Sequence, residues 1–271
     1  MENEPRLRDL ELGDIPGLAC LAPEEWHIAL DAVLLQHFAR RYFLGRIAAD
    51  ARGIVAVGQG IAAGDAGWIG NIIVRTEARR HGLGTRLTQD LVDRLRALGC
   101  RTLLLIATVA GAPVYFKLGF RRTSDYVFLR VPRLPPAPTR YIRRLQPSQA
   151  DEVLELDRLA TGESRAELLA PHLGTGWGHV AAIGSLGGYF LPSFGAGLVV
   201  ASQPVAGLDL LAFKHAFFPG DAVVPAANVP ALQFLAAHGA EETSRSPRMA
   251  LGDDLAWRPE WVFARGSGYC G

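Results

Sequence analysis

The sequence has almost no excess of charge of either sign, and this excludes one large class of partner. Its 271 residues carry 28 basic and 27 acidic side chains, which gives a formal net charge of +1. Such a balance creates no long-range field that attracts nucleic acid, and no basic stretch is interleaved with aromatic residues. We therefore expect no nucleic-acid partner.

Cysteines and long apolar runs are also scarce. The three cysteines, Cys20, Cys100 and Cys270, are far apart and odd in number, which favours free thiols in a reducing compartment over a disulfide framework. Residues 1–6 are charged and lack the apolar core of a secretory signal. The longest apolar stretch, residues 103–116, falls short of the roughly 18 residues of a membrane span. The sequence therefore predicts a cytoplasmic protein without a membrane partner.

The length and one proline-rich stretch predict two domains. A single hydrophobic core rarely grows beyond about 250 residues. Residues 132–138 contain four prolines in seven positions, which suits neither a helix nor a sheet ladder. We expect an N-terminal domain at residues 1–131, this stretch as a linker, and a C-terminal domain at residues 139–271.

Hydrophobic periodicity predicts an α+β fold with a mostly antiparallel sheet flanked by helices. In the first half, strands are expected at residues 6–14, 42–48, 53–62, 67–74, 101–108 and 120–131. Helices are expected around residues 15–22, 30–38, 83–98 and 113–119. The second half repeats this order in part, and Gly119 and Gly239 end similar segments 120 positions apart.

One turn between a strand and a helix has the pattern of an anion site. An Ile-Ile-Val strand ends at Val74, and Gly82 and Gly84 precede an amphipathic helix. Glycine lets the backbone approach a ligand closely, and a helix N-terminus presents N–H groups with about half a positive charge. A pyrophosphate fits such a turn. The pattern lacks the Lys-Ser/Thr of a P-loop and the third glycine of a dinucleotide fingerprint, and by itself it also fits an ordinary connection.

Two motifs in order give the turn a family resemblance. Arg79-x-x-Gly82-x-Gly84 resembles the coenzyme A signature of the GNAT acetyltransferases, and residues 112–120 are similar to their second motif, in which Tyr115 precedes a Gly-Phe pair by four. Residues 68–120 resemble the N-terminal half of a bacterial tandem-GNAT subfamily. Its C-terminal half is matched by residues 157–165, residues 228–239 and the pair Arg248-Met249.

The resemblance implies two tandem GNAT-fold domains, acetyl-CoA as the acyl donor, and a set of binding residues. Backbone N–H groups in the turn hold the pyrophosphate, the strand edge at Ile72 and Val74 pairs with the pantetheine amides, and an N–H near Val74 stabilises negative charge on the thioester carbonyl. Arg79 either joins this site or only braces the loop. The residues implied in binding acetyl-CoA are Ile72, Val74, Arg79, Arg80, Gly82, Gly84 and Thr85.

The implied reaction is direct transfer of the acetyl group to a neutral primary amine, without a covalent enzyme intermediate. Tyr115 is the implied catalytic acid that protonates the departing thiolate. A thiolate with a pKa of about 8.5 leaves readily, so the expected contribution of this acid is modest. The alternative for Tyr115 is a packing role on a short helix. The pattern identifies no general base.

The acceptor is expected to contact the segment between the first two helices. Its candidates are Glu24, Glu25, Trp26 and His27, although each alone also suits an ordinary structural role. A small-molecule amine is the leading acceptor; the alternatives are a protein lysine or N-terminus, or a non-catalytic module that senses acetyl-CoA. No histidine has the spacing of a metal site, so no metal is expected. The sequence gives no indication of an oligomer.

The chain departs from the subfamily pattern at two places. Ile106 stands before Ala107-Thr108 where the subfamily has an Asp. In the second half, residues 202–207 lack the Arg and the paired glycines, and Leu235 stands in the place of Tyr115. We therefore expect that the C-terminal half does not hold acetyl-CoA productively and instead forms a wall of the acceptor cleft.

Overall fold

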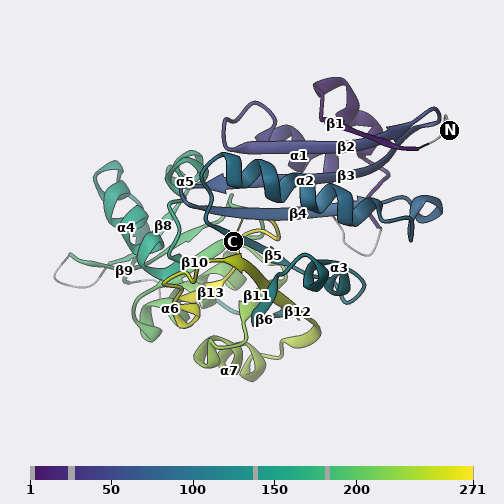
Figure 1. The fold of residues 1–271 in the computed structure, drawn as a ribbon. Helices are drawn as coiled ribbons and strands as arrows, with labels where there is room; N and C mark the ends of the chain where they lie inside the picture. Colours follow the sequence, from purple (N-terminus) through teal and green to yellow (C-terminus); the bar gives the residue numbers. More distant parts are fainter. Residues whose placement is uncertain (1–3, 24–27, 137–139, 181–183, 271) are drawn as a thin grey trace.

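The computed structural model describes residues 4–23, 28–136, 140–180 and 184–270 (Figure 1). It confirms the predicted α+β class. The elements of the first half are β1 (Arg6–Asp9), η1 (Leu12–Leu18), α1 (Leu30–His37), β2 (Phe43–Asp50), β3 (Gly53–Ala63), β4 (Ala66–Val74), η3 (Thr76–Ala78), α2 (Leu83–Ala97), β5 (Thr102–Ile106), α3 (Ala112–Lys117) and β6 (Arg121–Arg130).

The second half begins with a short strand and continues with the same alternation of helices and strands. Its elements are β7 (Ile142–Arg144), η4 (Pro147–Gln149), α4 (Ala150–Thr161), α5 (Ala166–Leu173), β8 (Trp177–Val180), β9 (Leu186–Leu191), β10 (Leu198–Ala201), α6 (Pro204–Phe217), β11 (Ala222–Pro225), α7 (Val229–Ala237), β12 (Glu241–Gly252), η5 (Pro259–Trp261) and β13 (Val262–Ala264). Part of the proline-rich stretch, residues 137 and 138, lies outside the described residues.

The first strand and helix are shorter than their sequence pattern predicts. β1 ends at Asp9 because the chain turns after it: the Asp14 carboxylate accepts hydrogen bonds from the Glu11 backbone N–H at 2.8 Å and from Arg8 at 2.7 Å. The Arg8 guanidinium also lowers the pKa of the Asp14 carboxyl below its usual value. The following segment is a 3₁₀ helix rather than an α-helix. Pro16 lies inside it and has no backbone N–H to donate.

Strands β1 to β4 form an antiparallel meander, in keeping with the predicted mostly antiparallel sheet, and β5 then runs parallel to β4. The β4–β5 pairing covers only Ala66–Trp68 and Thr102–Leu104. From Ile69 onward, no strand in the described part of the chain pairs with β4 on this side. The two strands therefore separate and leave one backbone edge of β4 open for hydrogen bonding.

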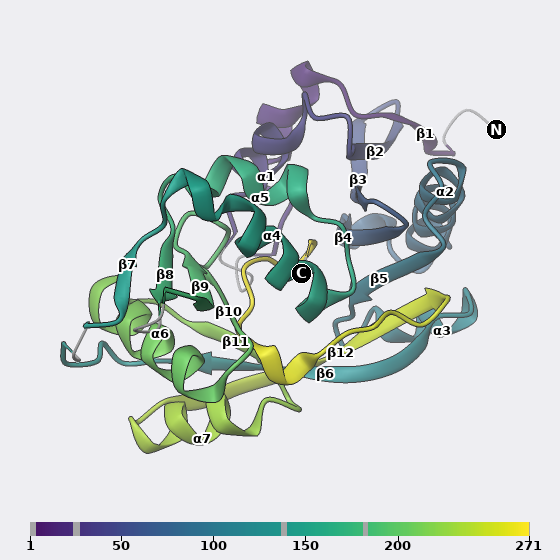
Figure 2. The ribbon, with the colours of Figure 1, turned by 90° about the vertical axis from the view of Figure 1, so that its left-hand side faces the viewer.

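The two halves exchange strands. The eight-stranded sheet has the order β1-β2-β3-β4-β5-β12-β6-β11, so β12 of the second half lies between β5 and β6 of the first. In return, β6 lies between β12 and β11. Figure 2 shows β6 and β12 side by side where the two halves meet, a boundary called the seam below. The proposed division at residues 132–138 thus separates two stretches of sequence that share one sheet.

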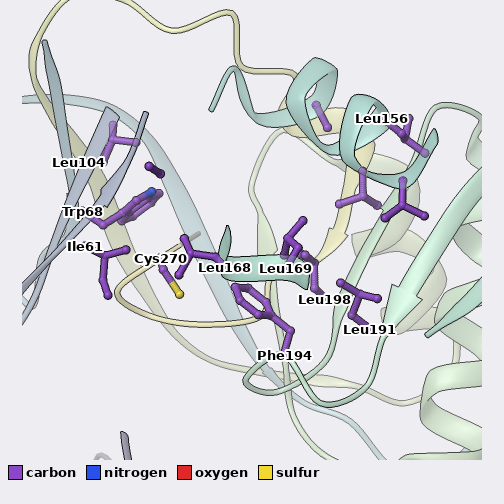
Figure 3. Packing of buried hydrophobic residues seen from close by; sticks show 14 of the residues in the cluster. Ile61, Trp68, Leu104, Leu156, Leu168, Leu169, Leu191, Phe194, Leu198 and Cys270 are labelled. Atoms are coloured by element: carbon purple, nitrogen blue, oxygen red, sulfur yellow. The ribbon is translucent and has the colours of Figure 1, made fainter. Parts of the chain in front are cut away.

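A hydrophobic core also spans the seam. Trp68 and Leu104 from the first half pack in one buried cluster with Leu168, Leu191 and Phe194 from the second. Figure 3 shows this arrangement, with Cys270 close to Trp68. Because the same cluster buries side chains of both halves, neither half covers its apolar face alone.

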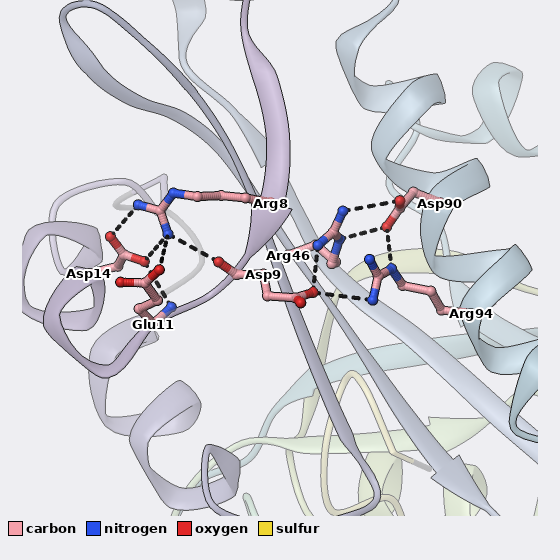
Figure 4. Close-up of polar contacts among 7 residues, drawn as sticks. All are labelled: Arg8, Asp9, Glu11, Asp14, Arg46, Asp90 and Arg94. Carbon is pink, nitrogen blue, oxygen red and sulfur yellow. Dashed lines mark hydrogen bonds and ion pairs between the residues drawn. The ribbon is translucent and has the colours of Figure 1, made fainter.

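Helix α2 is fixed against the outer face of the meander by packing and by charge. Its Leu87, Leu91 and Leu95 are fully buried, and they approach β3 where Gly58 and Gly60 leave room for them. The buried Arg46 of β2 donates to Asp90 of α2 at 2.6 Å and also pairs with Asp9 of β1 (Figure 4). These contacts set the position of the N-terminus of α2 relative to β4.

Candidate active site

The loop between β4 and α2 is held by its own arginine. Arg79 Nε donates to the Val74 carbonyl oxygen at 2.9 Å, which fastens the loop to the end of β4. Arg80 follows with a φ of 66° and Gly82 with a φ of 76°. A positive φ is uncommon for a residue with a side chain, and such conformations often occur at functional sites. In this structure Arg79 therefore braces the turn.

The N-terminus of α2 presents free backbone donors. The first hydrogen bond within the helix runs from the Arg86 N–H to the Gly82 carbonyl at 3.0 Å. The N–H groups of Leu83, Gly84 and Thr85 precede that bond and have no acceptor within the helix. No acidic residue lies in the first turn, and nothing lies within 4 Å of a Cβ placed on Gly82. The turn brings residues 80–85, which the sequence predicts to bind the cofactor, together around these N–H groups.

The open edge of β4 contains a bulge. Asn71 has a φ of 52°, and the β3–β4 register shifts between Val57 and Gln59. Beyond this shift Ile72 packs toward α2, and Ile73 is buried on the other face. Val74 is half-buried and closes the strand beside the turn. An extended ligand bound along residues 70–74 would therefore lead from the helix N-terminus into the space between β4 and β5.

Tyr115 lies on α3, and its phenol is held in an apolar setting. Its ring contacts the edge of Phe120 with the centroids 6.0 Å apart, and burial raises the pKa of Tyr115 to about 12. A Cβ on Gly111 would lie 3.1 Å from the ring, so glycine leaves the room that the tyrosine occupies. The hydroxyl stays protonated at neutral pH, and a proton donor needs that state.

The predicted acceptor contacts Glu24, Glu25, Trp26 and His27 lie outside the described residues. The structure shows a contact that the sequence did not predict on the face of β4 that is turned away from α2. Tyr269, near the C-terminus, passes so close to Gly70 that a Cβ there would lie 2.4 Å from its own Cβ. Sequence reasoning did not find this contact. The only local signal was a glycine inside a strand, which often marks a close approach of another backbone.

In the described residues of the second half, the corresponding place is filled by the chain. Strand β13 pairs with β10, and the Arg265 N–H donates to the Val223 carbonyl of β11 at 2.8 Å, so β13 occupies the space between these two strands. The Phe263 ring lies against Gly207 near the start of α6, where an added Cβ would come within 2.2 Å of it. The chain itself thus fills the place that is open in the first half.

Two further classes of feature do not occur in the described ranges. No helix of residues 4–23, 28–136, 140–180 or 184–270 is long and apolar enough to cross a membrane. Within the same ranges, no three His, Cys, Asp or Glu side chains gather as a metal site would require.

Comparison with known proteins identifies the fold of the chain and a family match in its first half. Residues 8–120 match the acetyltransferase (GNAT) family. No curated protein matches the chain in sequence. Among solved structures, a Pyrococcus horikoshii protein provisionally assigned as an acetyltransferase is 18% identical, with 98% of this chain and 96% of that chain covered and a TM-score of 0.84.

Two other solved structures share the whole architecture at low identity. One is a tandem GNAT protein from the clavulanic acid biosynthesis pathway, 15% identical, with 92% and 98% of the two chains covered and a TM-score of 0.62. The other is a GCN5-related glucosamine N-acetyltransferase region of a fungal multi-domain β-N-acetylglucosaminidase, 14% identical, with 92% and 38% covered and a TM-score of 0.64. At these identities the likeness shows the fold. Residues 8–120 thus match the GNAT family of acetyltransferases, and the chain as a whole has the fold of two tandem GNAT halves.

Proposed function

We propose that the chain transfers the acetyl group of acetyl-CoA directly to a primary amine of a small molecule, at the site formed by β4, α2 and α3. One observation carries the proposal: the bared N–H groups of residues 80–85 lie at the end of the strand whose edge is open from Ile69 onward. A diphosphate and an extended amide chain, joined in that order, match these two features.

Each part of the site has a role in this proposal. Bound acetyl-CoA supplies a thioester whose carbonyl carbon a neutral amine can attack. The N–H groups of Arg80, Gly82, Gly84 and Thr85 hold the diphosphate, and Arg79 keeps their loop in shape through its bond to Val74. The edge of β4 at Ile72 and Val74 aligns the amide chain. A backbone N–H near Val74 would face the negative charge that develops on the carbonyl oxygen.

Tyr115 provides the proton for the leaving thiolate in this scheme. Its burial keeps the phenol protonated across the neutral range, with a pKa raised to about 12. A thiol of the leaving group's class has an ordinary pKa of about 8.5, so proton transfer from Tyr115 assists a group that already leaves well. Tyr115 assists departure of the thiolate through its position rather than through its acid strength.

The second half is proposed to serve the acceptor side and to carry no working donor site. β13 and Phe263 fill the place that acetyl-CoA would need there. Glu163 of the second half accepts a hydrogen bond from Trp68 Nε1 at 2.7 Å, and Tyr269 covers Gly70. A face covered in this way favours a small acceptor over a protein lysine or N-terminus. The glucosamine named for the fungal relative is also an amine of a small molecule.

Calorimetry with acetyl-CoA, followed by an assay of thiol release over a panel of small amines, tests the proposal. We expect one binding event per chain and turnover on at least one amine. Binding without turnover on any amine would support the acetyl-CoA sensor instead. A chain that binds no acetyl-CoA would exclude both functions.

Replacing Tyr115 with Phe should lower kcat about 100-fold, the low end of the usual contribution of a general acid, because the thiolate is a good leaving group. The dissociation constant of acetyl-CoA should stay the same, because the ring and its packing on Phe120 remain. Steady-state kinetics with the best amine of the panel, beside calorimetry of the same variant, measure both quantities. An unchanged kcat would remove Tyr115 from the mechanism and leave it a packing residue.

A further inference from the structure

A cluster of buried charges lies where the two halves meet around Trp68. Each of its five charged residues is at least 97% buried, which is unusual for such side chains. The cluster comprises Asp157, Glu163, Arg165, Arg248 and Arg265. Three of these residues are positive and two are negative.

One pair in the cluster is complete. Arg165 Nε donates to Asp157 Oδ2 at 2.9 Å, and a second guanidinium nitrogen bonds the other carboxylate oxygen. The Tyr189 hydroxyl also donates to Asp157, and Arg165 Nη1 donates to the Cys270 carbonyl at 3.0 Å. These partners satisfy both charges, so the pair requires no ligand.

Arg248 and Arg265 are different. Arg248 Nη1 donates to Thr123 Oγ1 at 3.1 Å, but its Nε and Nη2 find no acceptor among the described side chains and backbone. Arg265 Nε and Nη2 are likewise unpartnered within the described residues, although each residue is only 3% exposed. Buried donors without acceptors are costly, and natural proteins rarely keep them without a reason.

The aromatic residues around these two arginines form a common cage. The Arg265 guanidinium lies 5.1 Å from the Trp68 ring centroid and 4.9 Å from that of Tyr126. The Arg248 guanidinium lies 5.9 Å from the Trp68 centroid and 4.1 Å from that of Trp257. Ring faces attract cations but accept no conventional hydrogen bond, so the cage orients the guanidinium groups without satisfying their N–H groups.

The cluster of five charged residues has one more positive than negative side chain. With Asp157 committed to Arg165, Glu163 is the remaining carboxylate of the cluster for two arginines, and it already accepts from Trp68 Nε1. Burial also raises the pKa of the Glu163 carboxyl, against the opposing effect of Arg165 and Arg248. A bound anion would balance the excess charge and accept the free N–H groups.

The cage lies beside the proposed site of transfer. Trp68 is the last residue of β4 that pairs with β5, and Arg248 of β12 pairs with Ile106, the last residue of β5. Trp68 and Ala250, which shares a strand face with Arg248, both belong to the core on the side of the second half. The arginines thus stand where β4 and β5 separate, on the face opposite α2.

We propose that Arg248 and Arg265 receive the carboxylate of the acceptor, so that the substrate is an amine that also carries a carboxylate, such as an amino acid. The inference rests on the proposed acetyl transfer. Guanidinium groups match the geometry of a carboxylate, and a desolvated setting strengthens such bonds. A polyamine would meet like charge here, and a neutral amino sugar would leave the N–H groups unpaired. A free inorganic anion such as chloride shares the chemistry and is the competing source.

Matched pairs of acceptors test the inference on the unmodified protein. Lysine and cadaverine, or phenylalanine and phenethylamine, differ by the carboxylate alone. We expect kcat/KM for the better carboxylated acceptor to exceed that of its decarboxylated partner by about 100-fold, as expected when a buried charged donor loses its partner. Equal rates within each pair would overturn the inference and leave acetyl transfer intact. Binding of acetyl-CoA without turnover on any amine would instead remove the proposed function, and this inference with it.

Substitutions of the two arginines test whether these residues cause the preference for a carboxylated acceptor. Arg248→Gln and Arg265→Gln should each raise KM for the carboxylated acceptor at least about 10-fold, since each removes a charged donor, while the dissociation constant of acetyl-CoA stays unchanged. Arg130→Gln, at an exposed position of β6, is the matched control and should leave both quantities unchanged. An unchanged KM in both cage variants would overturn the assignment. If a variant does not fold, the acceptor pairs still decide.

The melting temperature in sodium chloride and in the sodium salt of HEPES, a bulky anion without a carboxylate, separates the two sources of anion. We expect the same melting temperature in both salts at equal ionic strength, because the proposed ligand of the two arginines is the acceptor and not an inorganic ion. A specific rise in chloride that is lost in Arg265→Gln would assign the cage to an inorganic ion and overturn the substrate inference.

Discussion

Residues 1–131 produced without the second half should fail to fold. The first half alone lacks β12, which hydrogen-bonds to β5 from Thr102 to Ile106 and to β6 along most of its length. It also leaves five buried apolar side chains of the seam in water, namely Trp68, Leu104, Val127, Leu129 and Val131. Each such exposure costs about 1.5–3 kcal/mol. Together they reach the whole net stability of a typical domain, about 5–15 kcal/mol.

Circular dichroism and urea unfolding of the fragment measure this directly. We expect no cooperative transition and no binding of acetyl-CoA. The matched control is the same fragment produced together with residues 132–271, which should restore both, because the exchanged strands come from both pieces. A fragment that unfolds cooperatively and binds acetyl-CoA alone would contradict the structural dependence of one half on the other.

The parts of the fold that the sequence predicts well are those fixed by local pattern. The leucines of α2 recur at helical spacing, and the structure places the helix at Leu83–Ala97 against a prediction of residues 83–98. The meander of β2, β3 and β4 follows from short apolar runs with turn residues between them. The turn before α2 is also local, since glycine and the helix start lie within a few residues of each other.

The strand exchange could not be predicted from such patterns. β12 has side chains that suit a strand, but its pattern does not say which strands will accept it, and here its partners lie more than 100 positions earlier in the chain. The role of β13 as the element that fills the second half's opening depends on pairing of the same non-local kind. Register and partner in a sheet are decided by burial in the folded chain, and one chain half gives no information about them.

The arginine cage also could not be predicted, because it too depends on strands that lie far apart in the sequence. Arg248 was noted only as part of a family resemblance, and Arg265 follows a three-residue strand at the end of the chain. Their meeting at Trp68 requires β12 and β13 to approach β4 from the second half. A single sequence shows each arginine as one of many basic residues. The structure distinguishes them by burial and by the absence of acceptors among the described residues.

Replacing Gly84 with Asp should weaken acetyl-CoA binding about 100-fold without lowering stability. A Cβ at Gly84 meets only Val74 Cγ2 at 3.8 Å, an ordinary contact, so the protein can hold the new side chain. At the second position of α2, a carboxylate interacts favourably with the helix dipole, by about 0.3–1 kcal/mol. The same carboxylate stands where the diphosphate is proposed to bind. Repulsion of a few kcal/mol at about 4 Å is enough for a 100-fold loss.

The opposite directions of these two effects make the variant decisive. Calorimetry with acetyl-CoA gives the affinity, and thermal unfolding without ligand gives the stability, which should be unchanged or slightly higher. Gly13→Asp is the matched control: it adds the same charge in η1, where nothing lies within 4 Å of the new Cβ, and should bind acetyl-CoA like the parent. Equal loss in both variants would indicate a general effect of charge. Unchanged binding in Gly84→Asp would mean that the N–H groups of α2 do not hold the diphosphate. A carboxylate next to those N–H groups would repel a diphosphate bound to them.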